Sequence, residues 1–223
     1  MEVFGKFFGL AFSALLPLIN PLGGALVFVS LVGPAPSAVY RSLARRIAIT
    51  TTLFFLIIEI IGTAMLKFFG ISLPVVQVSG GLALAAMGWG LLRDDQAPPK
   101  QEIAEIDDQT IESLEQRVFY PFTFPITAGP GCLVVMVTLS AQATIRGQGM
   151  IPDIAAHLGI VVAVLLLSVG VYVCYGYAPA ITARISQQTV HGITRVIAFV
   201  LLCIGVQIMW NGIAVLLKTV LHT

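Results

Sequence analysis

The sequence predicts an all-α integral membrane protein with six transmembrane helices, arranged as two inverted three-helix repeats in which helices one and four are broken. The first observation is composition: 57% of the residues are hydrophobic and 10% are charged, whereas soluble domains carry about 25% charged residues. The second is that charge is nearly absent from six long stretches of the chain. The third is a pair of segments rich in proline and glycine, one in each half.

The six stretches follow from the cost of placing charge in lipid. A charge near the bilayer centre costs about 2.5–3.5 kcal/mol, so charged residues mark the loops. Each stretch reaches the ~20 residues that are needed to cross ~30 Å of hydrocarbon. Only the second contains an Asp, Glu, Lys or Arg residue, which is Glu59. The predicted spans are 7–40, 47–66, 68–92, 118–145, 154–183 and 196–217.

The first and fourth spans are predicted to be interrupted. The first has 34 residues, which as a straight helix would be about 51 Å long and would exceed the bilayer core. A single proline kink is common in membrane helices, but a matched pair of breaks, one per half, favours two interrupted helices. The first segment contains Pro17, Asn20, Pro21, Gly23 and Gly24, and the second contains Pro125, Gly129, Pro130 and Gly131. The run after Lys6 is longer than a signal-peptide core, so we expect a retained helix.

The loop charges predict the orientation and the domain boundaries. The loops after spans one, three and five hold eight Lys and Arg residues and the opposite side holds four, so we expect the first side to be cytoplasmic and both termini to lie outside. Residues 1–92 form the first repeat, 93–117 a cytoplasmic acidic linker with a net charge of −5, and 118–223 the second repeat. Because each half has three spans, the second half must be inverted. The linker is a solvated connection or a docking site for a cytosolic partner; Ile103, Ile106, Ile111 and Leu114 recur near helical spacing there.

The two breaks are the candidate substrate site. The first N–H groups of a half-helix lack intrahelical partners and carry partial positive charge, so they suit a carboxylate. The carbonyl groups before the break suit an ammonium group, and small residues leave room for a small ligand. A neutral amino acid zwitterion fits these requirements, since no charged residue lies near either break. The candidate binding residues are Asn20, Pro21, Gly23, Gly24, Thr127, Ala128, Gly129 and Gly131.

Glu59 is the candidate coupling residue. An intramembrane carboxyl is by default a functional candidate; the alternative is a carboxyl beside a water-filled vestibule or one kept neutral by burial. Gln77, Gln207 and Asn211 are interpreted as interhelical hydrogen-bonding groups. The sequence contains no metal-ligand spacing, catalytic motif, nucleotide loop or concentrated basic patch, so we expect no metal, no cofactor, no enzymatic activity and no nucleic-acid partner.

Taken together, these residues resemble the MarC family of bacterial inner-membrane proteins, also called UPF0056, over nearly the whole chain. Val78 departs from the basic residue or Gln expected before the glycine pair, and Gln77 is the candidate for that role. The resemblance implies opposed broken helices, a bacterial inner-membrane location and transport of small neutral amino acids such as glycine or alanine. It is carried by Asn20-Pro21-Leu22-Gly23, Pro125, Ala128-Gly129-Pro130-Gly131, Phe68-Phe69-Gly70-Ile71, Gly80-Gly81 and Val206-Gln207.

We therefore expect a secondary transporter for small neutral solutes that works by alternating access, with a proton or a sodium ion as the coupling ion. Two alternatives stay open. One is a passive channel for small solutes, although channels usually show rings of charge or a repeated filter sequence. The other is a membrane interaction protein that transports nothing.

Overall fold

The computed structural model describes residues 1–93, 114–145, 150–184 and 187–221. Within these ranges the chain forms helices and no β-strand. Most of the acidic linker, including Ile103, Ile106 and Ile111, lies outside the described residues. At its described end Leu114 is buried, and Glu115 forms a 2.9 Å ion pair with Arg46. Both charged side chains are partly exposed, so this pair contributes little to stability.

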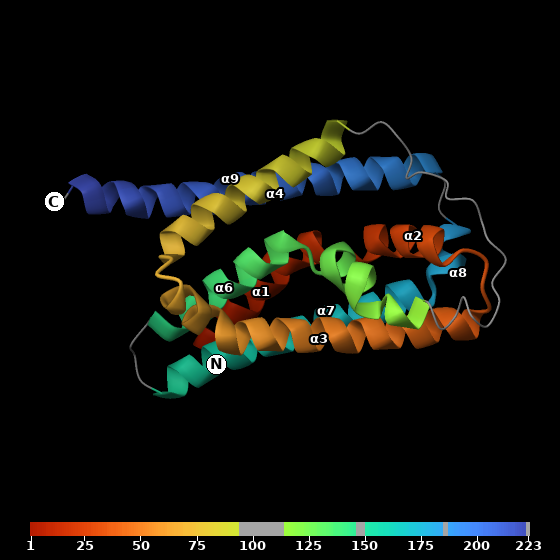
Figure 1. The fold of residues 1–223 in the computed structure, drawn as a ribbon, viewed down its shortest axis with the longest axis horizontal. Helices are drawn as coiled ribbons and strands as arrows, with labels where there is room; N and C mark the ends of the chain where they lie inside the picture. Colours follow the sequence, from red (N-terminus) through yellow and green to blue (C-terminus); the bar gives the residue numbers. More distant parts are fainter. Residues whose placement is uncertain (94–113, 146–149, 185–186, 222–223) are drawn as a thin grey trace.

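Figure 1 shows the helices running roughly along one axis, with the marked N and C termini toward the same end. In the described part of the chain, five segments are long and apolar enough to cross a membrane, and the bent pair η1–α6 makes a sixth if it counts as one span. The prediction of a helical membrane protein is thus confirmed. The elements are α1 Glu2–Ile19, α2 Pro21–Val32, α3 Ser37–Phe68, α4 Leu73–Arg93, η1 Val118–Thr127, α6 Pro130–Ile145, α7 Met150–Gly176, α8 Ala178–Thr182 and α9 Gln187–Leu221.

The first charge-free stretch, 7–40, extends past the end of the first candidate span, Glu2–Val32. Helix α2 ends at Val32, Gly33 adopts a left-handed φ of 71°, and α3 begins at Ser37. The predicted interruption of the first helix therefore does not by itself explain why this charge-free stretch is too long for one span. The connection between α2 and α3 contains glycine and proline but no charge, so counting charges could not detect it.

Helices α4 and α9 pack against each other along their length and form one unit (Figure 1). Glycines bring the two backbones into contact. A Cβ on Gly88 would lie 2.6 Å from the Leu202 backbone nitrogen, and one on Gly205 would lie 2.7 Å from the Gly81 carbonyl oxygen. Small residues allow such close approach between membrane helices. We call this contact between α4 and α9 the glycine seam. The glycines that form it are seven residues apart on each helix, a wider spacing than in the GxxxG pattern.

The remaining helices form a second group around α7, which packs on α1, α2 and α3. An aromatic cluster packs these helices together near the two predicted breaks. The Phe28 ring stacks on Tyr175 at 4.9 Å between centroids and meets Phe122 edge-on at 5.2 Å and Tyr40 edge-on at 5.6 Å. Because these rings come from α2, α3, η1 and α7, they hold the segments after the first break and before the second break against α7.

Candidate functional site

The first break is a single residue, Asn20. Its φ of 42° and ψ of 66° are left-handed, a conformation that asparagine tolerates better than most residues. Asn20 ends α1 by donating its N–H to the Leu16 carbonyl oxygen at 2.9 Å. It begins α2 by accepting the Gly23 N–H on Oδ1 at 3.0 Å, and Pro21 takes the first helical position. An asparagine cap followed by proline is a strong helix start.

In this conformation the N–H groups of Gly23 and Gly24 are not open to a ligand. The Asn20 side chain accepts from Gly23 and the Asn20 carbonyl accepts the Gly24 N–H at 2.8 Å. The asparagine therefore occupies the position where a substrate carboxylate was predicted. A ligand at these groups would have to displace the Asn20 carboxamide, and the assignment of Asn20, Pro21, Gly23 and Gly24 to substrate binding stays a prediction.

The second break redirects the chain far more strongly. Helices η1 and α6 meet at an angle of 73°, and Tyr120 and Phe124 inside η1 have non-helical dihedral angles. Threonine hydroxyls satisfy part of the irregular backbone: the Thr127 hydroxyl donates to the Phe122 carbonyl at 2.7 Å, and the Thr123 hydroxyl donates to the Val118 carbonyl at 2.8 Å. Buried backbone needs such partners in a membrane.

The Tyr175 hydroxyl on α7 joins the two breaks. Its oxygen lies 3.0 Å from the Thr127 hydroxyl oxygen, at the end of η1. A Cβ built on Gly24 would overlap the same hydroxyl and would lie 3.0 Å from Cζ of the ring. Gly24, Thr127 and Tyr175 are all buried. The structure therefore brings Gly24 of the first break and Thr127 of the second together on one side chain.

Sequence reasoning missed Tyr175. Tyrosines near the end of an apolar span are typical of the aromatic belt at the membrane surface, and Tyr172 and Tyr177 lie beside it in the sequence. The only available signal was that a tyrosine hydroxyl needs a partner when it is buried. That partner, Thr127, is 48 residues away in the sequence.

The glycines of the second break are packed by α4 and α1. A Cβ on Gly131 would overlap the side chain of Leu84 and lie 3.3 Å from that of Leu18. One on Gly129 would lie 3.3 Å from the Pro125 carbonyl oxygen. Ala128 is fully buried. Leu18 lies two residues before Asn20, so this contact also places the end of α1 beside the start of α6.

Glu59 belongs to a second polar cluster, formed by α3, α6 and α7. Its Oε1 lies 2.6 Å from Nδ1 of His157, and the Ser140 hydroxyl donates to its backbone carbonyl at 2.8 Å. The Glu59 side chain is only 5% exposed, and Oε2 is buried without a protein partner. A cavity of about 370 Å³ lies at this cluster, with Thr63 and Thr144 among its lining residues.

The sequence identified Glu59 but not His157. The histidine belongs to no metal-ligand spacing, and no local pattern links residues 98 positions apart. Among the described residues, no group of three or more His, Cys, Asp or Glu side chains could hold a metal ion. What this arrangement can do is hold and transfer a proton, since a carboxyl group and an imidazole share a hydrogen bond and the second carboxyl oxygen is unpaired.

The amides of spans three and six do not bond as predicted. The Gln207 carboxamide donates to Asn211 Oδ1 at 2.9 Å, but both residues lie on α9, one helical turn apart. This bond is therefore within a helix and does not join two helices. Gln77 on α4 is buried, and all three residues line one cavity.

Comparison with known proteins relates nearly the whole chain to one family. The family model described as MarC family integral membrane protein matches residues 5–217. The UPF0056 inner membrane protein MarC of Salmonella paratyphi B is 28% identical over 98% of this chain and 99% of that protein. The protein of the same name from Escherichia coli O1:K1 / APEC is 27% identical over 96% of this chain and 97% of its own. No solved structure gives a significant match.

Proposed function

This chain belongs to the MarC family of integral membrane proteins, and from that premise we propose that it is a secondary transporter for small neutral solutes, such as the amino acids glycine and alanine. Its relatives are named inner membrane proteins, and we place this chain in the bacterial inner membrane with both termini outside the cytoplasm. The observation that carries the proposal is the convergence of two interrupted spans on Tyr175. Broken helices that meet are the usual substrate site of secondary transporters.

The helix contacts support two inverted repeats, 1–92 and 118–223. Spans three and six pack together as α4 and α9, and spans two and five pack together as α3 and α7. The first span packs on α7 through α1, and the fourth packs on α3 through η1 and α6. A two-fold axis that exchanges the halves would generate this pattern. It would pair each span with its counterpart in the other half, and it would exchange the contact of the first span on α7 with that of the fourth span on α3.

Alternating access in this fold requires the packed breaks to open. Leu84 of α4 covers Gly131, and the glycine seam joins α4 firmly to α9. We propose that the α4–α9 unit moves as one body against the remaining helices and so uncovers the second break. The Glu59–His157 pair would supply coupling by carrying a proton, with a sodium ion at the unpaired Glu59 oxygen as the alternative.

Uptake into proteoliposomes tests the function. We expect radiolabelled glycine or alanine to accumulate above equilibrium when a proton or sodium gradient is imposed. We expect Gly24→Val to abolish uptake, since its side chain would overlap Tyr175. Gly170→Val on α7 is the matched control, because a Cβ there meets nothing within 4 Å. Uptake that only equilibrates would indicate a channel, and no uptake of any neutral amino acid would refute the proposal.

A further inference from the structure

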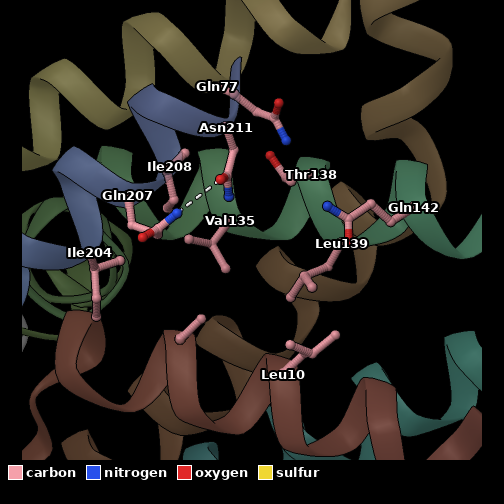
Figure 2. A pocket seen from close by; sticks show the side chains of 11 residues that line it. Leu10, Gln77, Val135, Thr138, Leu139, Gln142, Ile204, Gln207, Ile208 and Asn211 are labelled. Carbon is pink, nitrogen blue, oxygen red and sulfur yellow. Dashed lines mark hydrogen bonds between the residues drawn. The ribbon is translucent and has the colours of Figure 1, made fainter. Parts of the chain in front are cut away.

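A cavity of about 270 Å³ lies at the boundary between the α4–α9 unit and the other helices (Figure 2). Its walls come from α1, α4, α6 and α9. One side is apolar and includes Leu10, Val135 and Leu139. The other is an amide cluster with one hydroxyl: Gln77, Thr138, Gln142, Gln207 and Asn211. None of the residues at the two breaks lines it.

These polar groups lack enough protein partners. Within the cluster the one hydrogen bond is that from Gln207 to Asn211. Thr138 is only 8% exposed, and its buried hydroxyl oxygen has no protein partner. Figure 2 shows this hydroxyl and the Gln77 carboxamide turned toward the same space. In lipid an unpartnered polar group is costly, so these groups require a polar occupant.

The lining selects the chemistry of that occupant. None of the described lining residues is ionisable, so nothing would compensate a net charge in this low-dielectric setting. Carboxamides both donate and accept hydrogen bonds, which suits a solute that has both kinds of group. The volume lies just below the range of about 300–1,000 Å³ typical of drug-sized ligands, so the solute is small.

We propose that this cavity is a second binding site, for a small solute of zero net charge that donates and accepts hydrogen bonds. Accepting the proposed transport function, its occupant is the transported solute on its way to or from the breaks. The position supports this: α6 begins beside the second break at Pro130, and Thr138 follows eight residues later on the same helix, ~12 Å along its axis. The cavity also lies at the boundary where the α4–α9 unit would move.

Equilibrium binding of radiolabelled glycine to the detergent-purified protein tests the site, with lysine and glutamate as charged competitors. We expect Thr138→Val and Gln77→Leu to weaken binding about 3- to 10-fold, as loss of one neutral hydrogen bond would. Thr138→Ser should restore the affinity because it keeps the hydroxyl. Thr219→Val is the control, since its hydroxyl bonds the Val215 carbonyl outside the cavity. Size-exclusion elution and circular dichroism check that each variant folds.

The outcomes separate this inference from the transport function. Wild-type glycine uptake combined with unchanged binding in Thr138→Val and Gln77→Leu would overturn the second site alone. Weakened binding in these variants without uptake by the wild type would support the site while refuting transport. If charged amino acids compete as well as alanine, the chemical class is wrong. If Gln77→Leu changes only the oligomeric state, the amides form an interface between copies and the inference fails.

Discussion

The contact between Gly24 and Tyr175 predicts a non-additive pair of substitutions. Gly24→Ala places a methyl group where the Tyr175 hydroxyl now lies, and Tyr175→Phe removes that hydroxyl. Each change alone should destabilise the protein. Together they should partly compensate, because the deleted oxygen leaves room for the added carbon.

The magnitudes follow from the two contacts. Overpacking by one carbon in a tight site costs about 1–3 kcal/mol. Loss of the Tyr175 hydroxyl removes one neutral hydrogen bond of about 0.5–1.5 kcal/mol, and Thr127 keeps its bond to the Phe122 carbonyl oxygen. The relief in the double variant is partial, since the new Cβ would still lie 3.0 Å from Cζ of the ring. We expect the double variant to lose at least about 0.5 kcal/mol less than the sum of the single variants.

The assay is reversible unfolding in mixed micelles, followed by circular dichroism for the wild type, both single variants and the double variant. Any gain in helix propensity from replacing glycine occurs in both arms of the cycle and cancels. Gly170→Ala serves as the control, because its Cβ meets no neighbour. If the two losses add within about 0.3 kcal/mol, Gly24 and Tyr175 are not in contact and the breaks do not converge on this hydroxyl.

Four further predictions follow. Asn20→Ala should lower the free energy of unfolding by about 1–3 kcal/mol through the lost cap and the left-handed φ, and Asn20→Gly by less, as measured by the same unfolding assay. Glu59→Gln should leave glycine binding near wild type while uptake loses its dependence on the proton gradient; abolished binding would put the substrate site at this pair instead. Gly88→Leu should separate α4 from α9 and reduce the folded yield, whereas Gly90→Leu, which meets no neighbour, should not; equal yields would rule out the seam. A reporter fused at Thr223 that is active only in the cytoplasm should be silent, and activity there would reverse the orientation.

The sequence by itself determined the membrane class and the location of the interruptions. Charge-free stretches mark spans because lipid excludes charge. Asn20-Pro21 and Gly129-Pro130 mark the ends of helices because proline blocks an interior hydrogen bond but suits the first helical position, and asparagine tolerates a left-handed φ. Local backbone chemistry decides all of these features, so they can be read without knowing the neighbours. The turn after Val32 escaped detection because it contains no charge to mark it.

Only the tertiary structure decided which groups meet. Tyr175 pairs with Thr127, and Glu59 pairs with His157, across 48 and 98 residues. Thr138 lines a cavity whose other polar walls come mainly from α4 and α9. No spacing along its own helix identifies the partner of any of these side chains. Whether such a group is paired, or is left for a solute, depends on how separate helices pack, which spacing along one helix does not encode.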